Sequence, residues 1–186
     1  FQTSDQGRYT SSAEDVDDRS NYYDRYYNGR HRLTILFAAG NDGPVTGTVG
    51  SPATAKNTIS VGNHQNRYSG SPDSIMSGSS RGPTDDGRIK PDLIAPGGYV
   101  RSCRAQEAAD TGGSTWSSTY YLEYTGTAMA TPNAAGAAAM IREYLEEIAQ
   151  RPSPQSALVK ALMILGATDI GSRDIPNDSE GWGKVN

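Results

Sequence analysis

The stretch YTGTAMATPNAAGAAAMI, residues 124–141 of this 186-residue chain, decides how the whole sequence is interpreted. Its small and apolar residues predict one long helix over 127–149. Because small side chains let neighbouring elements approach closely, we expect this helix to run through the middle of the domain. Gly126 allows a sharp turn into the helix. Ala128 falls in its first turn, where unpaired N–H groups and the positive end of the helix dipole collect.

That first turn is a position where a reactive side chain would be effective. A hydroxyl at residue 128 would lie at the mouth of the helix, beside N–H groups able to hold an anion. The residue present is Ala128, which has no group that can attack a substrate. Taken by itself it is more simply explained as a good helix former, so the rest of the sequence has to decide.

Three apolar runs predict the strands of a buried sheet, namely LTILFAAGN (33–41), NTISVG (57–62) and KPDLIAPG (90–97). Continuous apolar runs that stop at small residues are typical of parallel strands covered on both faces. Helices are predicted over 11–29, 127–149 and 152–170. The alternation of strands and helices indicates an α/β fold, with a parallel sheet flanked by helices.

Capping signals set the expected ends of the first and last helices. The first begins at a capping box of Ser11 and Glu14 and ends at Gly29, and its tyrosines are expected to pack against the sheet. The last has Ser153 as its expected N-cap and Pro154 at its first helical position. Because apolar residues surround the last helix almost completely, we expect it to be buried.

The composition describes a loop-rich globular domain, with 35% apolar residues, 21 glycines and 10 prolines. The net charge is −4 and no basic patch dominates, which argues against a nucleic-acid partner. No apolar run reaches the ~18 residues that cross a bilayer, so no membrane span is predicted. The single cysteine, Cys103, excludes an intrachain disulfide and is expected to be half-buried. Residues 98–123 predict a hairpin or a long excursion.

Asn41 ends the first predicted strand, at the sheet edge where ligands bind in parallel α/β folds. Its carboxamide could donate a hydrogen bond to an oxygen that becomes negative during a reaction. The surrounding GNDGP is also good turn chemistry, which explains Asn41 equally well. The two histidines, His31 and His64, lack the motif of a general base and are expected in surface loops.

Four segments, in this order and at this spacing, resemble the C-terminal half of the catalytic domain of the subtilisin-like serine peptidases, the subtilases. They are TILFAAGNDGP (34–44), GSPATAKNTISVG (50–62), SSRGPTDDGRIKPDLIAPG (79–97) and GTAMATPNAAGAAAMI (126–141). The resemblance covers residues 8–186 and is nearest to the oxidatively stable alkaline proteases of bacilli. It implies that residues 1–186 are the C-terminal portion of one subtilisin-like domain, which needs an N-terminal portion to complete its sheet.

The resemblance implies a role for each matching position. Ala128 stands where the family has its nucleophilic serine. Asn41 matches the asparagine of the oxyanion hole, and the backbone N–H of residue 128 would be the second donor. The implied substrate-binding residues, several of which wall the pocket for the side chain before the scissile bond, are Ala38, Ala39, Gly40, Gly50, Gly126 and Thr127. Small walls imply a pocket for large apolar or aromatic side chains, and Ser51–Pro52 matches a cis-proline position of the family.

The sequence departs from the family pattern at its chemical centre. Ala128 leaves no Oγ to attack a carbonyl. The family's aspartate motif, D-[ST]-G, and histidine motif, H-G-T-H, lie upstream of the matched region and are absent from this chain. Asn133 replaces a common histidine and Gly78 replaces a common aromatic residue, but neither change weakens the resemblance.

Two interpretations therefore stay open. The first is a serine endopeptidase with a Ser-His-Asp mechanism, inactive here because its serine was replaced on purpose. The intact Asn41 and GTxMATP frame favour it. The second is a natural pseudopeptidase that serves as a peptide-binding or scaffold module. An unrelated phosphate-binding α/β domain is disfavoured, because no glycine-rich loop with a lysine opens a helix.

The resemblance also implies partners and surroundings. The substrate would be a polypeptide, and the missing aspartate and histidine predict the N-terminal half of the same domain as a second chain or missing segment. The family implies a secreted or extracytoplasmic location. No cofactor is required for catalysis. Structural calcium is expected as a possibility, since loops such as NDSEG (177–181) offer oxygen ligands, although without a specific spacing.

Overall fold

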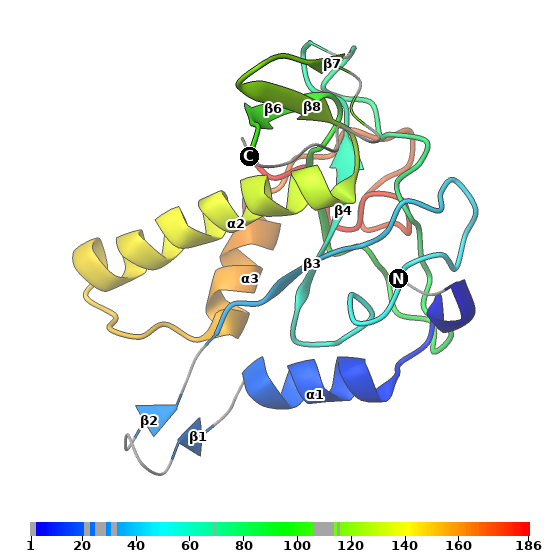
Figure 1. Cartoon of the computed structure of the whole chain (residues 1–186). Helices are drawn as coiled ribbons and strands as arrows, with labels where there is room; N and C mark the ends of the chain where they lie inside the picture. The colour runs from blue at the N-terminus through cyan, green and yellow to red at the C-terminus, as the bar shows by residue number, and fades with distance from the viewer. Residues whose placement is uncertain are drawn as a thin grey trace.

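The computed structural model describes residues 3–20, 23–24, 29–30, 33–68, 70–105, 114 and 116–186. Figure 1 shows a central sheet with the long helix α2 lying across it, and a smaller sheet of β6, β7 and β8 at one end of the molecule. The N-terminal helix α1 lies apart from α2, on the other side of the central strands.

The central sheet consists of β3 (Leu36–Ala38), β4 (Ile59–His64) and β5 (Leu93–Pro96), all parallel and in the order β3-β4-β5. Val61 of β4 lies opposite Ala38 of β3, and β4 is buried along its whole length. β3 and β5 fall within their predicted apolar runs, and β4 begins in its run, 57–62, but continues to His64. The predicted α/β class, with a parallel sheet flanked by helices, is confirmed.

The helix α2 (Thr127–Glu143) continues as a π-helical turn, η2 (Tyr144–Ile148), and contacts all three strands of the central sheet. Ala130, Ala134 and Ala138 recur every fourth residue and form the buried face of the helix. Their small side chains allow α2 to approach the sheet closely. The predicted central helix over 127–149 is therefore confirmed.

The helix α3 (Ser156–Leu165) packs against α2 and begins later than predicted. Gln155 is its N-cap, because Ser153 has a φ of 55° and belongs to a left-handed turn before the helix. The predicted burial of the whole helix is also wrong, since Val159 is buried but Leu165 is 81% exposed. No helix in the described part of the chain is long and apolar enough to cross a membrane.

The first helix, α1 (Ser11–Ser20), is shorter than predicted and is followed by the antiparallel pair β1 (Tyr23–Asp24) and β2 (Gly29–Arg30). Gly29 is therefore a strand residue and not a C-cap. At the end of α1 a serine hydroxyl donates a hydrogen bond of 2.8 Å to the carbonyl of Asp17, a local bond that competes with helix continuation. The predicted packing of the tyrosines lies outside the described side chains.

A short 3-10 helix, η1 (Thr3–Asp5), precedes α1. Asp17 of α1 binds the loop before β4. Its carboxylate accepts hydrogen bonds from the backbone N–H groups of Lys56 at 2.9 Å and Asn57 at 2.7 Å. The Tyr9 hydroxyl donates to the same carboxylate at 2.9 Å. Burial, and then this bond to Asp17, raise the pKa of Tyr9 to about 12.

The smaller sheet is antiparallel and contains β6 (Val100–Cys103), β7 (Trp116–Ser117) and β8 (Tyr121–Tyr124) in the order β6-β8-β7. Of the two alternatives for residues 98–123, the hairpin is therefore correct. Cys103 is exposed rather than half-buried, because it occupies the end of an edge strand of this sheet.

The two edges of the central sheet differ. At the β5 edge, the Ile94 N–H donates to the carbonyl of Gly183 at 3.0 Å, and the Val185 N–H donates to the carbonyl of Ile94 at 2.9 Å. The C-terminal segment therefore closes that edge. At the β3 edge, no strand of the described residues pairs with the sheet. An unpaired edge leaves N–H and C=O groups free for another strand.

A buried cluster of charges ties β4 and β5 to α3. The Asp92 carboxylate lies 2.7 Å from the Lys90 Nζ and 2.8 Å from the Lys160 Nζ. It also accepts a hydrogen bond of 2.7 Å from the Ser60 N–H. Burial lowers the pKa of Lys90 to about 8, and the attraction of Asp92 offsets only part of that effect.

Candidate active site

The carboxyl ends of the central strands meet the start of α2. The Gly97 N–H, just after β5, donates to the carbonyl of His64 at the end of β4, at 3.1 Å. The carbonyl of Gly97 accepts from the Gly126 N–H at 2.9 Å. This is the edge at which parallel α/β folds bind ligands, and the residues singled out from the sequence gather there.

Asn41 and Thr127 form the centre of this arrangement, although they lie 86 positions apart in the chain. The Oδ1 atom of Asn41 accepts hydrogen bonds from the Thr127 N–H at 2.9 Å and from the Thr127 hydroxyl at 3.1 Å. The Thr127 Oγ1 in turn accepts from the Gly40 N–H at 3.2 Å. Thr127 is fully buried, so the Thr127 side of this network is shielded from water. It orients the carboxamide of Asn41.

The consequence is a donor held ready in the cleft. Because both Thr127 donors point to Oδ1, the Nδ2 of Asn41 must face the other way. Within the described part of the chain, no acceptor forms a hydrogen bond with this Nδ2. Asn41 itself is exposed, and so is the neighbouring Ala128 in the first turn of α2. An oxygen entering here would meet the Nδ2 and the N–H of Ala128, the one N–H in the described first turn of α2 without a hydrogen-bond partner.

Gly126 is required by the close approach of these two segments. Its φ is 153°, and a Cβ at this position would lie 3.3 Å from both Nδ2 and Oδ1 of Asn41. A Cβ on Gly97 would lie 2.6 Å from the carbonyl oxygen of Gly126, which is closer than real Cβ atoms come. The two glycines therefore let the Asn41 loop, the end of β5 and α2 come together.

The residues expected to wall the substrate pocket are also adjacent. The Gly50 N–H donates to the carbonyl of Ala39 at 3.0 Å, and both residues are buried. Ala38 ends β3, and Gly40 follows with a φ of 119°. The Ser51–Pro52 peptide bond is cis, as the resemblance implies. All six predicted substrate-binding positions thus belong to two segments on either side of Asn41 and to the start of α2.

His64 contradicts its prediction as a surface-loop residue. It is the last residue of β4 and only 2% exposed, because pairing with Pro96 and a bridge to Ile75 carry the strand inward. Burial lowers its pKa, and its Nδ1 lies 2.6 Å from the carbonyl of Gln65. His31 lies outside the described residues.

Ser80 supports the Asn41 loop and was not singled out from the sequence. Its N–H donates to the carbonyl of Gly40 at 3.0 Å, and its Oγ accepts from the Asp42 N–H at 3.1 Å. Ser80 is fully buried. The SSRGP segment that contains it was recognised only as part of a motif. The signal that could have revealed this role is a pair of small polar residues in a loop between two buried strands.

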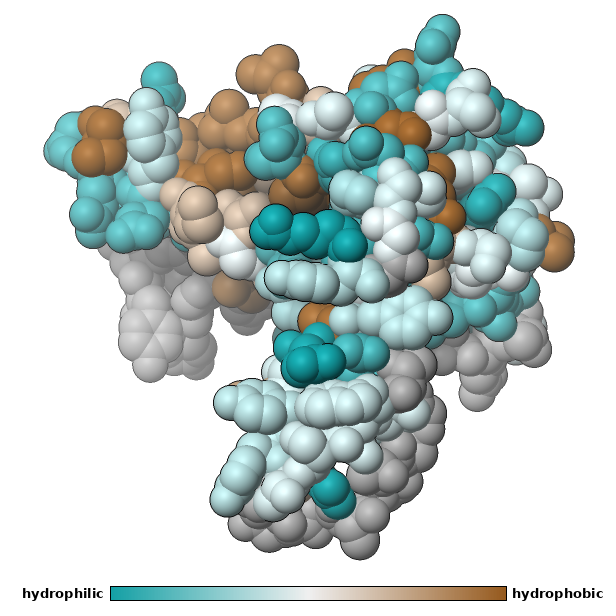
Figure 2. Space-filling view, turned by 90° about the horizontal axis from the view of Figure 1, so that it is seen from above, coloured by the Kyte–Doolittle hydropathy of each residue, from teal (hydrophilic) through white to brown (hydrophobic). Residues whose placement is uncertain are grey.

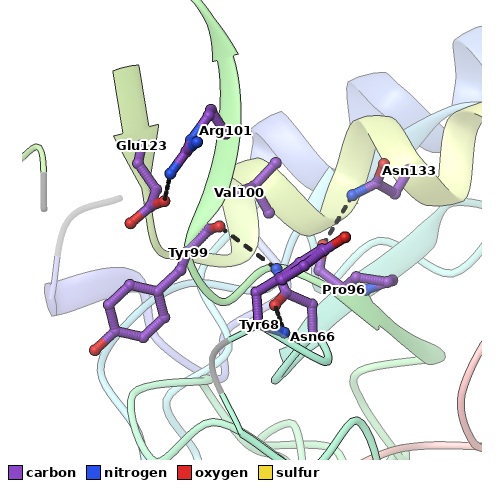
Figure 3. A pocket seen from close by; sticks show the side chains of 8 residues that line it. All are labelled: Asn66, Tyr68, Pro96, Tyr99, Val100, Arg101, Glu123 and Asn133. Carbon is purple, nitrogen blue, oxygen red and sulfur yellow. Dashed lines mark hydrogen bonds and ion pairs between the residues drawn. The ribbon is translucent and has the colours of Figure 1, made fainter. Parts of the chain in front are cut away.

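A pocket of about 690 Å³ lies along α2 and the end of β5 (Figure 3). On one side the Asn133 side chain donates to the carbonyl of Pro96 at 2.9 Å, and the Tyr68 side chain is 87% exposed. On the other side Arg101 and Glu123 form an ion pair of 3.2 Å. This pocket reaches the second turn of α2 through Asn133.

In the loops predicted to bind calcium, the carboxylate of Glu180 is occupied by hydrogen bonds within the chain. The buried carboxylate of Glu180 accepts hydrogen bonds from the Ile170 N–H at 3.1 Å, the Gly171 N–H at 3.2 Å and the Asn177 Nδ2 at 3.0 Å. Across the described residues, no three His, Cys, Asp or Glu side chains gather as they would around a metal ion. Calcium binding stays a prediction.

Comparison with known proteins identifies the family. The model of the subtilase family, peptidase family S8, matches residues 3–183. The chain belongs to the subtilase family.

Relatives and solved structures agree with this assignment. The serine protease AprX of Bacillus subtilis is 37% identical over 164 residues, which cover 83% of this chain and 34% of AprX. The subtilisin-like protease SBT6.1 of Arabidopsis thaliana is 30% identical over 160 residues, covering 82% of this chain and 14% of that protein. The CspB protease of Clostridium perfringens superposes with a TM-score of 0.60 at 30% identity, over 75% of this chain and 27% of that one. This subtilase chain therefore spans about a third or less of the length of these relatives.

Proposed function

We propose that residues 1–186 are the C-terminal portion of a subtilase peptidase domain whose cleft binds polypeptide substrates. The observation that carries this proposal is the double hydrogen bond from Thr127 to Asn41, which leaves the Asn41 Nδ2 as a donor beside residue 128. In acyl transfer, the carbonyl oxygen of the scissile bond becomes negative. Two fixed donors that meet this oxygen stabilise the transition state more than the ground state.

The proposed chemistry needs a nucleophile that this chain lacks. With serine at position 128, the Oγ would attack the scissile carbonyl while a histidine takes its proton, and an aspartate would orient that histidine. The Asn41 Nδ2 and the N–H of residue 128 would hold the oxyanion. The amine then leaves with the proton from the histidine, and water releases the acyl group by the reverse path. With Ala128 the first bond cannot form, so the chain as it stands binds peptides without cleaving them.

The small residues at the positions implied to wall the substrate pocket support a preference for large side chains before the scissile bond. Ala38, Ala39 and Gly40 on one side and Gly50 on the other add little side-chain volume. A roomy pocket with apolar walls favours aromatic or large aliphatic groups, because burying them releases the most water.

The histidine and aspartate would come from a complementing N-terminal half of the domain, and the exposed face of α2 supports this. From Thr127 to Ile141 the helix carries no charged residue. A helix that is uncharged all round is normally buried, yet Pro132, Gly136 and Met140 are exposed, Met140 by 69%. Figure 2 shows apolar side chains gathered over this part of the molecule.

The sheet is unpaired at its β3 edge among the described residues, and α2 packs against β3 as well as the other central strands. A segment that extends the sheet at β3 could therefore also cover the exposed face of α2. Gly136 leaves open space where a Cβ would stand, so a second helix could approach α2 closely. A histidine on such a segment would come within reach of residue 128.

A second candidate function is a natural pseudopeptidase, which the alanine at 128 favours. One variant separates the two. Ala128→Ser in the full gene product is expected to react with a fluorophosphonate probe and to cleave casein if the chain is a peptidase. A complete, folded protein that is not labelled at residue 128 would contradict the peptidase and leave a cleft used for binding.

Three finer features belong to the same proposal. Kinship with the oxidatively stable alkaline proteases of bacilli and a secreted location rest on the sequence resemblance. Structural calcium rests on the oxygen-rich loops near the C-terminus. If a chelator does not change the thermal unfolding midpoint, the proposal of structural calcium is contradicted.

A further inference from the structure

A second pocket, of about 230 Å³, lies between residues 75–81 and the C-terminal loop 169–181. It is separate from the pocket of Figure 3 and shares no lining residue with it. Its lining is rich in hydrogen-bond donors, including Arg81, Ser172, Arg173 and Ser179. Neither the proposed reaction nor the complementing segment uses these residues.

Arg81 is the unusual member of this set. Its guanidinium forms no hydrogen bond and no ion pair within the described part of the chain, and its Nε is buried without a partner. Its backbone, in contrast, is fixed by hydrogen bonds to Thr48 at 3.0 and 2.8 Å. Arg81 as a whole is half-buried, but a buried N–H donor without an acceptor is unfavourable, so an acceptor that reaches it in the pocket would be bound with a gain.

The acids nearby do not supply that acceptor. The carboxylate of Glu180 lines the pocket but already accepts three hydrogen bonds from Ile170, Gly171 and Asn177. Asp178 has an Oδ1 that is buried without a partner, and burial raises its pKa against the opposing effect of Arg173. No carboxylate oxygen of the described residues lies within 4.0 Å of the Arg81 or Arg173 guanidinium.

We propose that this pocket binds a small oxyanion, a carboxylate or a phosphate group, between Arg81 and Arg173. The planar guanidinium of Arg81 offers two parallel N–H donors that match two oxygens of such a group, and Arg173 adds a second positive charge. The hydroxyls of Ser172 and Ser179 line the pocket as further donors. At about 230 Å³ the pocket admits an oxyanion or an acidic side chain but no large ligand.

The bound anion would stabilise the segment that supports the candidate active site. Arg81 follows Ser80 directly, and Ser80 holds the Asn41 loop through its bonds to Gly40 and Asp42. An anion that links Arg81 to Arg173 would therefore join the C-terminal loop to the segment that supports Asn41. Its expected effect is a higher unfolding temperature.

The test is the thermal unfolding midpoint of the complete protein, measured against phosphate and, in a separate series, acetate. Chloride replaces the anion so that ionic strength and pH stay constant. We expect a saturable rise of about 3–5 °C at ten times the dissociation constant. A rise with phosphate alone or with acetate alone identifies which oxyanion the pocket takes.

Matched variants decide whether the pocket is responsible. Arg81→Gln and Arg173→Gln should each abolish the saturable rise, whereas Arg67→Gln, which removes an exposed arginine elsewhere, should keep it. If Arg81→Gln does not fold, Arg81→Lys keeps the charge without the planar fork and should weaken the apparent affinity about tenfold. No saturable rise, or an equal rise in all variants, would overturn the proposal.

Discussion

The N-terminal end of α2 has hydrogen-bond partners in this chain, whereas the outward face of the helix is exposed. At its N-terminus Thr127 and Gly126 are held against Asn41 and Gly97 by hydrogen bonds of 2.9 to 3.1 Å. On the face turned away from the sheet, Met140 is 69% and Tyr144 is 58% exposed, and the helix carries no charged residue from Thr127 to Ile141.

This difference shows which part of the site is formed by residues of this chain alone. The proposed oxyanion side of the cleft depends on contacts among three segments of this chain, and all of them are present in the structure. The other side is an apolar surface that water contacts unfavourably. A binding site that is organised on one side and apolar and open on the other fits a domain whose second half carries the proton-transfer groups.

The largest expected effect is the loss of kcat when the Asn41 side chain is removed. In the Ala128→Ser background, Asn41→Ala should lower kcat by roughly 10²–10³ with little change in KM, a magnitude measured for the corresponding change in subtilisin itself. Steady-state hydrolysis of a peptide substrate measures it. Asn133→Ala removes a similar side chain one and a half turns along α2 and should change kcat only a few-fold. Equal losses in both variants would contradict the assigned role of Asn41.

The next effect tests the open side. If a second half covers α2, Met140→Asp in the complete protein buries a carboxylate and should lower the free energy of unfolding by about 2 kcal/mol or more. Leu165→Asp, at an 81% exposed position on α3, should change it by less than about 0.5 kcal/mol. Urea unfolding compares them. Equally small changes would mean that the α2 face stays in water.

A smaller effect on kcat is expected when the Thr127 hydroxyl, which orients Asn41, is removed. Thr127→Val keeps the shape of the side chain but removes the hydroxyl that bonds Asn41 and accepts from Gly40. Each of these two hydrogen bonds is worth about 1 kcal/mol, and the one to Asn41 orients the proposed oxyanion donor, so kcat in the Ala128→Ser background should fall about five- to tenfold. Thr131→Val is the matched control, because that hydroxyl donates only to the carbonyl of Thr127. An unchanged kcat for Thr127→Val would show that the network is not needed.

The last effect depends on pH and concerns the buried charges of Lys90 and Asp92. Burial lowers the pKa of Lys90 to about 8 from 10.5, so between these values the unfolded chain binds more protons than the folded one. The free energy of unfolding contributed by Lys90 must then increase as the pH rises from 8. Tyr9 acts in the opposite direction above about pH 10, because its pKa is raised to about 12.

The comparison therefore stays between pH 8 and 10. Over that range the parent should gain a few degrees in its unfolding midpoint relative to Lys90→Met. Lys56→Met, which removes an exposed lysine, should follow the parent. A parallel pH dependence of Lys90→Met and the parent would contradict the shifted pKa.

Local patterns predicted the elements that build the cleft. The apolar runs gave β3, β4 and β5, and the small residues after Gly126 gave α2, because burial and close packing leave a signature in the sequence. The residues that failed depend on distant partners. His64 is polar but is drawn inward by Pro96 and Ile75, and the helix predicted to reach Gly29 stops at Ser20, shortly after Asp17 bonds to the loop before β4. Single-sequence patterns do not contain such pairings.

The most direct test of the organised cleft uses Ala128 as it stands. A crystal structure of the complete protein with an uncut peptide should place the scissile carbonyl oxygen about 2.7–3.1 Å from both the Asn41 Nδ2 and the Ala128 N–H nitrogen. The side chain before that bond should lie between residues 38–40 and Gly50. A peptide bound elsewhere, or an Asn41 whose Nδ2 is turned toward Thr127, would contradict the account.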